Sequence, residues 1–261
     1  MSKPIVGMLH LPALPGAPGY RGDFEKIRRH VLRDAETLAD GGVDGFMLEN
    51  FGDTPFYPGV VPAYVGAYMT ALAVEVRRRY ALPLGINVLR NDGCAALGIA
   101  HAVGAEFIRV NVLCGARLAD QGILHGVAHE LLRLRATLGA EKIKILADVN
   151  VKHSAPLGPL RPLEQEVCDL IRRGGADGVI VSGAGTGQAT NVVELVQVKA
   201  AAGDAPVWVG SGATPENAGA FGEHADGFIV GTALQEQGVS GAAVDPRRVR
   251  EFVAAVRKLN A

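Results

Sequence analysis

One short phrase occurs four times in this chain, each time between a helix-like stretch and a short apolar run. The copies are Gly42-Val43-Asp44-Gly45, Gly104-Ala105-Glu106-Phe107, Gly175-Ala176-Asp177-Gly178 and, without the first glycine, His224-Ala225-Asp226-Gly227. A glycine can take the left-handed conformation that ends a helix, and an apolar run after it is typical of a buried parallel strand. The runs are Phe46–Leu48, Ile108–Val110, Val179–Val181 and Phe228–Val230. The phrase therefore predicts four strands, each preceded by a helix.

The spacing of the copies predicts the architecture. Successive copies lie roughly 50–70 residues apart, which is about two βα units by the usual lengths of such units. Four pairs of βα units make a (β/α)8 barrel. The chain has 261 residues, of which 48% are hydrophobic, enough for the core of one such barrel. We therefore predict an α/β fold, a single TIM barrel in which residues 1–261 form one domain.

The elements between the repeats can also be placed. The other four strands are predicted at Ile5–Leu11, Leu84–Leu89, Ile143–Val149 and Val207–Gly210. Helical patterns cover 23–39 with Asp23 as N-cap, 192–202 after Thr190 or Asn191, and 245–259 with Pro246 at its first position. Several loops that leave the strands are long and rich in proline and glycine, including 113–122 and 152–162. In a barrel these loops lie on the face that carries the chemistry.

Composition narrows the classes of partner. The net charge of −1 gives no reason to expect a nucleic acid or an anionic membrane. Three cysteines without metal-type spacing favour reduced thiols, and neither a signal peptide nor an apolar run of roughly 20 residues is evident. We expect a cytoplasmic protein without a transmembrane segment. The sequence does not identify a cofactor, and it leaves a homo-oligomer open.

Glycine-rich loops follow the last three predicted strands. Gly210, Ser211 and Gly212 follow one strand, Gly231 and Thr232 follow the next along the chain, and Gly183 and Gly185 stand in the segment 182–187 after the strand before them. Phosphate-binding barrels use the loops after strands 7 and 8, where backbone N–H groups approach the anion. Tight strand-to-helix turns would also need glycine. The two loops together favour a barrel of the phosphate-binding type.

Polar residues stand where the predicted strands end. The candidates for catalysis are Asp148, Lys152, Glu49, His10 and His153. The candidates for substrate binding are Asn50, Asn87, Arg90, Asn111, Asn150 and Ser182. Alternation along one strand predicts that Asp148, Asn150 and Lys152 share a face that rises toward the rim. A carboxylate and an ammonium there could act as base and electrophile, and Lys152 could alternatively form a Schiff base.

Structural roles remain open for the same residues. Asp148 could serve only to neutralise Lys152 or Arg109 inside the barrel. His10, Glu49 and Asp148 are ligand types that suit a divalent metal, but no local spacing supports such a site, and we predict none. The basic pair Arg247-Arg248 is predicted to lie on a solvated helix face.

With these residues in place, the chain resembles the BtpA family of barrel proteins over nearly its whole length. The resemblance lies in the blocks 7–12 with 14–16, 49–53 with 55–56, 87–92, 109–112, 115–116 with 120–122, 147–149, 151–153, 210–212 and 230–232. The family often has histidine where this chain has Asn150. It is named for a role in photosystem I biogenesis in cyanobacteria, although similar sequences occur in organisms without photosynthesis.

Two functions follow as hypotheses. The first is an enzyme that acts by acid–base chemistry on a phosphorylated sugar or nucleotide-like metabolite, as a lyase, an isomerase or a glycosidic-bond hydrolase. The second is a non-enzymatic assembly or regulatory factor, the role that the resemblance implies. An assembly factor would favour an exposed apolar patch or an added basic segment, and the sequence shows neither clearly.

Overall fold

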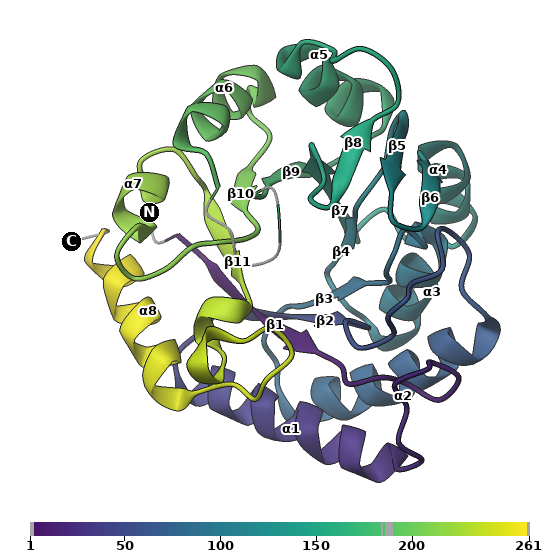
Figure 1. The fold of residues 1–261 in the computed structure, drawn as a ribbon, viewed down its shortest axis with the longest axis vertical. Helices are drawn as coiled ribbons and strands as arrows, with labels where there is room; N and C mark the ends of the chain where they lie inside the picture. Colours follow the sequence, from purple (N-terminus) through teal and green to yellow (C-terminus); the bar gives the residue numbers. More distant parts are fainter. Residues whose placement is uncertain (1–2, 184, 186–189, 260–261) are drawn as a thin grey trace.

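A closed barrel of eight parallel strands forms the centre of the molecule in this computed structural model, which describes residues 3–183, 185 and 190–259 (Figure 1). The strands, in their order around the barrel, are β1 (Ile5–His10), β2 (Gly45–Glu49), β3 (Leu84–Asn87), β4 (Phe107–Val110), β7 (Lys144–Val149), β9 (Gly178–Val181), β10 (Val207–Val209) and β11 (Gly227–Val230). β11 pairs with β1 and closes the barrel. The predicted TIM barrel is confirmed.

The repeated phrase has a structural role at each junction. Gly42, Gly104 and Gly175 have φ angles of 88°, 67° and 66°, so they use the conformation that glycine favours at the end of a helix. The acidic residue of each copy accepts a hydrogen bond from the first backbone N–H groups of a neighbouring strand. The pairs are Asp44 with Ile5 (2.7 Å), Glu106 with Leu84 (2.8 Å), Asp177 with Ile145 (2.9 Å) and Asp226 with Val207 (2.7 Å). Each copy thus ends a helix and ties together the starts of two strands.

Helices surround the barrel. They are α1 (Phe24–Asp40), α2 (Ala63–Arg79), α3 (Gly93–Val103), α4 (Ala128–Thr137), α5 (Leu163–Cys168), α6 (Val192–Ala202), α7 (Ala218–Gly222) and α8 (Pro246–Lys258). A π-helical stretch, Asp169–Arg173, continues α5, and 3-10 turns at Thr232–Leu234 and Glu236–Gly238 follow β11. Asp23, Asn191 and Asp245 cap α1, α6 and α8 through their side chains. Asp23 is the predicted cap of α1, and Asn191 is one of the two residues predicted for α6.

Two hydrophobic layers hold this arrangement. The larger layer lies between barrel and helices. A smaller cluster, which includes Met8, Met47, Phe107 and Ile180 with Trp208 packed against it, comes from inward-facing strand positions. Burial of these side chains is the main stabilising contribution. The polar residues at the carboxyl ends of the strands lie outside these apolar layers and form the mouth of the barrel.

The loops predicted at 113–122 and 152–162 are more ordered than expected. Parts of them form a three-stranded antiparallel sheet, in which β5 (Ala116–Ala119) lies between β6 (Gly122–His125) and β8 (Ser154–Pro156). This sheet was not predicted, because its strands are short. β5 and β6 form a hairpin joined by Asp120 and Gln121, whereas β8 joins β5 from a distant part of the chain. In the described part of the chain, no helix has the length and apolar character to cross a membrane.

Candidate functional site

Six polar residues predicted at the mouth lie together at one end of the barrel. His10, Glu49, Asn87, Asn111, Asp148 and Ser182 are all buried, and each stands at or just after the carboxyl end of a strand. Two cavities open among and above them. We call these the first and the second cavity, and Glu49, Arg109 and Lys152 line both.

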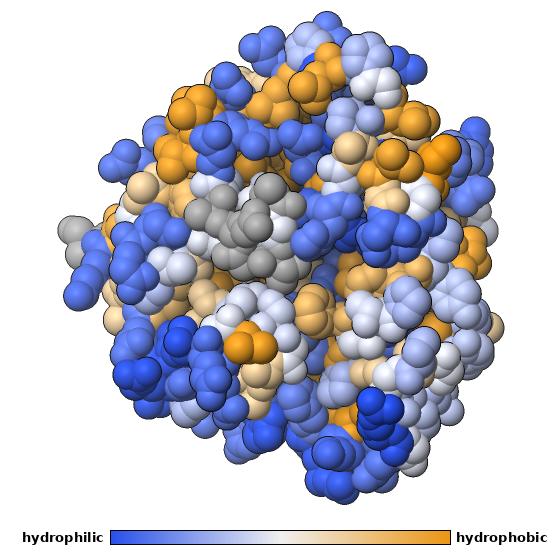
Figure 2. Space-filling view, in the orientation of Figure 1, coloured by the Kyte–Doolittle hydropathy of each residue, from blue (hydrophilic) through white to orange (hydrophobic). Residues whose placement is uncertain are grey.

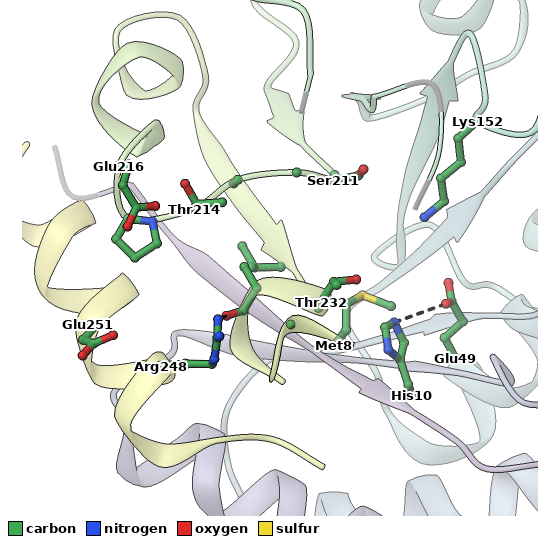
Figure 3. Close-up of a pocket in the computed structure, with 18 of the residues that line it drawn as sticks. Met8, His10, Glu49, Lys152, Ser211, Thr214, Glu216, Thr232, Arg248 and Glu251 are labelled. Atoms are coloured by element: carbon green, nitrogen blue, oxygen red, sulfur yellow. Dashed lines mark hydrogen bonds and ion pairs between the residues drawn. The ribbon is translucent and has the colours of Figure 1, made fainter. Parts of the chain in front are cut away.

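The first cavity has a volume of about 280 Å³ and lies between the glycine loops and the centre of the mouth (Figure 3). Its lining includes Gly210, Ser211 and Gly212 after β10 and Gly231 and Thr232 after β11. Among the described residues, no hydrogen bond occupies the backbone N–H of Gly212 or of Thr232. Arg248 from the first turn of α8 lines the same cavity, as do the carboxylates of Glu216 and Glu251. The cavity is therefore lined by two residues whose backbone amides have no described partner and by an arginine.

Two of these glycines are required by the geometry. A Cβ atom on Gly231 would lie 2.7 Å from Cε1 of His10, so a side chain there would displace the imidazole. Gly212 has a φ of 69°, where any other residue is strained. The glycines predicted after β10 and β11 thus bring backbone close to the cavity.

His10 is held in one tautomer by Gln235, which is 1% exposed. Oε1 of Gln235 accepts a hydrogen bond from Gly241 N (3.1 Å), so its Nε2 is the atom that donates to Nδ1 of His10 (3.0 Å). The neutral imidazole therefore carries its proton on Nε2, which lies 3.6 Å from Oε1 of Glu49. Burial lowers the pKa of His10 and outweighs the opposing effect of Glu49, so the neutral form is favoured. The ring also stacks on Phe51, with centroids 4.4 Å apart.

Lys152 extends toward Glu49 and His10 from the opposite side of the mouth (Figure 3). Burial lowers the pKa of its ammonium, and the nearby Arg109 lowers it further. A lysine in this setting can lose a proton or form a Schiff base more readily than an exposed one.

Asp148 does not point into the cleft with Lys152, contrary to the prediction. Its carboxylate accepts hydrogen bonds from Arg109 Nε (2.9 Å), Arg109 Nη2 (3.0 Å) and Asn111 Nδ2 (2.8 Å). It lines neither cavity. Of the structural roles left open by the sequence, the geometry matches neutralisation of Arg109. Burial lowers and Asp148 raises the pKa of Arg109, with a net rise, so the guanidinium stays charged.

Asn150 is also placed differently from the prediction. β7 ends at Val149, and Asn150 has a φ of 53°, so the alternation of the strand stops before this residue. Its side chain is exposed and contacts Arg117 and Glu194 rather than the cavities.

The second cavity, of about 370 Å³, shares Glu49, Arg109 and Lys152 with the first cavity, but the glycine loops after β10 and β11 do not line it. Arg90, Asn111 and His153 from the predicted set line it, together with Phe51, Phe56, Asp120 and Gln121. Burial lowers the pKa of His153, and Lys152 lowers it further.

The remaining predicted residues shape the mouth from behind. Asn50 holds the loop after β3 by hydrogen bonds with Leu89 N (2.7 Å) and Leu89 O (3.3 Å). Asn87 donates to Arg109 O (3.1 Å), and the buried hydroxyl of Ser182 has no hydrogen-bond partner among the described residues. Gly183 and Gly185 line neither cavity, although Gly185 O accepts a hydrogen bond from Ser211. Ala184, Thr186 and Gly187 of the same predicted loop lie outside the described residues.

Three residues of the site were missed or misplaced by the sequence analysis. Arg109 was considered only as a partner of Asp148, although an arginine inside the apolar strand β4 is itself a signal of a buried charge. Arg248 was assigned to a solvated face, yet it lines the first cavity, whereas the neighbouring Arg247 side chain is 71% exposed. Gln235 carried no local signal, since only tertiary packing brings it to His10. The described residues contain no cluster of three or more metal-ligating side chains.

Comparison with known proteins shows relatives over the whole chain. The family model described as "BtpA family" matches residues 1–258. An uncharacterised protein of Thermococcus kodakarensis is 46% identical over 257 residues, covering 98% of this chain and 96% of its own. The photosystem I biogenesis protein BtpA of Synechocystis is 44% identical over 254 residues, covering 97% of this chain and 88% of its own. Among solved structures, thiamine phosphate pyrophosphorylase of Pyrococcus furiosus is similar in fold, with a TM-score of 0.58 at 13% identity and coverage of 99% of this chain and 97% of its own.

Proposed function

This chain belongs to the BtpA family, and we propose that its barrel is an enzyme that acts by acid–base chemistry on a phosphorylated small molecule. The observation that carries the proposal is the first cavity. It combines the backbone N–H groups of Gly212 and Thr232, which no described residue occupies, with the side chains of His10, Glu49 and Lys152. An anion-binding end and a titratable end in one cavity are typical of enzymes that act on phosphorylated substrates.

Each group has a proposed role. The two backbone amides and Arg248 bind the phosphate, since N–H donors and a guanidinium suit its oxygens. Glu49 takes a proton from a carbon next to a carbonyl group of the substrate, so that negative charge develops on the carbonyl oxygen. Lys152 and Nε2–H of His10 donate hydrogen bonds to the oxygen that gains negative charge. The 3.6 Å between His10 and Glu49 exceeds a usual hydrogen bond, so Nε2–H remains available to a substrate oxygen.

Binding of a phosphorylated compound tests the anion end directly. Glucitol 6-phosphate is a suitable calorimetric probe, because it joins a phosphate to a flexible sugar chain. Arg248→Met is expected to weaken its binding about tenfold, as loss of a charge-assisted hydrogen bond does. Arg247→Met is the matched control, because this neighbouring arginine does not line the cavity.

The glycine loop can be tested in the same assay. Gly212→Val is expected to weaken binding by roughly 1–3 kcal/mol by blocking hydrogen bonds to the anion. Gly139→Val is the control for backbone strain, since Gly139 has a φ of 61° and no atom within 4 Å of the position that a Cβ would take. Unchanged affinity in both Arg248→Met and Gly212→Val, or no binding of any phosphorylated sugar, would count against the proposal.

An assembly function is the second candidate, and two observations favour it. The Synechocystis relative is named for photosystem I biogenesis. In addition, the apolar side chains of Leu118, Ile123, Leu157 and Leu160 are exposed on or beside the small β5–β6–β8 sheet (Figure 2). Expression of this chain in Synechocystis that lacks its own relative separates the two functions. Rescue by the double variant Glu49→Gln with Lys152→Met would favour assembly. Loss of rescue in each of the two single variants would favour an enzyme.

A further inference from the structure

Arg90 is a buried cation without an anionic partner in the part of the chain that is described. Arg90 is 4% exposed and lines the second cavity. Nη2 donates one hydrogen bond, to Lys152 O at 2.5 Å. No other side-chain hydrogen bond and no ion pair of Arg90 occurs among residues 3–183, 185 and 190–259. A buried charge without an ion-pair partner costs folding free energy, unless a ligand supplies the missing partner.

The carboxylates nearby do not neutralise Arg90. Both oxygens of Asp148 are taken by Arg109 and Asn111. Glu49 and Asp120 line the cavity but lie beyond ion-pair distance from the Arg90 guanidinium. Burial lowers the pKa of Arg90, and the favourable influence of Asp148, Glu49 and Asp120 does not offset it.

The position of Arg90 is well defined, as a binding residue requires. Its backbone N–H donates to Tyr57 O (3.0 Å), and Asn50 holds the preceding residue at both its N–H and its carbonyl. The loop after β3 therefore presents the guanidinium to the second cavity from a fixed backbone. Its planar fork of N–H donors matches a carboxylate, which can accept two parallel hydrogen bonds.

The two cavities place this group relative to the phosphate. The loops with Gly212 and Thr232 line only the first cavity, Arg90 lines only the second, and Glu49 and Lys152 line both. A ligand that fills both spaces has its two ends on opposite sides of Glu49 and Lys152. Its middle carbons then lie beside the groups proposed to move protons.

We propose that the substrate is a phosphorylated sugar acid, with its phosphate in the first cavity and a carboxylate bound by Arg90 in the second. This inference rests on the proposed function, because it takes the phosphate end from it. It adds that the other end of the substrate is a carboxylate, and it assigns Arg90 as the residue that binds this group.

A matched pair of ligands tests the inference by calorimetry. 6-Phosphogluconate and glucitol 6-phosphate have the same carbon chain and phosphate, and they differ in whether the other end is a carboxylate or a hydroxymethyl group. The wild-type protein is expected to bind 6-phosphogluconate about 10- to 100-fold more tightly, as a charge-assisted, bidentate contact allows. Arg90→Met is expected to abolish that preference while leaving the affinity for glucitol 6-phosphate unchanged. Arg248→Met is expected to weaken both ligands by the same factor.

A melting curve without ligand distinguishes this role from a structural one. Arg90→Met removes an uncompensated buried charge, so its Tm is expected to equal or exceed that of the wild type. Equal affinity of the wild-type protein for the two ligands overturns the inference and leaves the proposed function intact, because phosphate binding persists. An Arg90→Met variant that loses both ligands equally, or melts well below the wild type, also overturns it. Absence of binding to both compounds removes the proposed function and this inference together.

Discussion

Replacement of Asp148 by asparagine removes one charge from a buried ion pair at the floor of the site. The side chains of Arg109 and Asp148 are 2% and 0% exposed, and the carboxylate accepts three hydrogen bonds of 2.8–3.0 Å. In the Asp148→Asn variant, the new amide N–H groups face N–H donors of Arg109 or Asn111, and the guanidinium stays buried without an anion. Loss of one partner of such a pair costs about 3–5 kcal/mol of folding free energy.

Equilibrium unfolding in urea measures this cost. Trp208 is the single tryptophan and packs against the cluster inside the barrel, so its fluorescence reports the barrel, while circular dichroism reports the helices. Coincident transitions from the two probes are needed before a free energy is derived. Asp204→Asn, at an exposed position, is the control for a carboxylate-to-amide change.

A second variant distinguishes the loss of the ion pair from the effect of one charge that is left buried without a partner. Arg109→Met with Asp148→Leu removes both partners, and replacement of a buried pair by apolar residues is often neutral or stabilising. The double variant is therefore expected to be more stable than Asp148→Asn. The reasoning is refuted if Asp148→Asn lies within about 1 kcal/mol of the wild type, or if the double variant is the less stable of the two. A large loss of turnover in Asp148→Asn at unchanged stability would restore Asp148 as a candidate base.

Three further predictions concern the centre of the mouth. Burial depresses the pKa of folded His10 below its ordinary value of 6.5, so its contribution to stability is present above that pH and lost as the pH falls below it. Below about pH 6.5, the unfolding free energy of the wild type should therefore fall more steeply than that of His10→Asn, by up to about 1.4 kcal/mol per pH unit, and parallel curves would contradict the shift. Nitrogen NMR should show the proton of neutral His10 on Nε2, and Gln235→Leu should populate the other tautomer as well; an unchanged spectrum would mean that Gln235 does not select it. Competitive acetylation measured as a function of pH should give Lys152 a pKa below the ordinary lysine value of 10.5, and a pKa at that value would argue against desolvation of its ammonium.

The repeated phrase made the barrel predictable, because its glycine ends a helix and the apolar run directly after it forms the next strand. The bonds of its acidic residues to neighbouring strands join distant segments and were not predictable. Helix ends, strand starts and the caps of α1 and α6 follow from residues that are close in sequence. The site was predictable only as far as strand ends could be recognised, which placed His10, Glu49 and Lys152 at the mouth. The directions of side chains beyond a strand end were not predictable, since Asn150 leaves the extended conformation directly after β7. Contacts between distant segments, such as Gln235 with His10 or Arg248 with the glycine loops, depend on packing that local patterns do not encode.

The central claim is that the loops after β10 and β11 hold a phosphate beside a set of acid–base groups. A crystal structure determined with saturating inorganic phosphate tests it most directly. The account predicts one phosphate in the first cavity, with oxygens within hydrogen-bond distance of the backbone N–H groups of Gly212 and Thr232 and of the Arg248 guanidinium. A first cavity without phosphate at saturation, or phosphate bound only elsewhere on the protein, would contradict it.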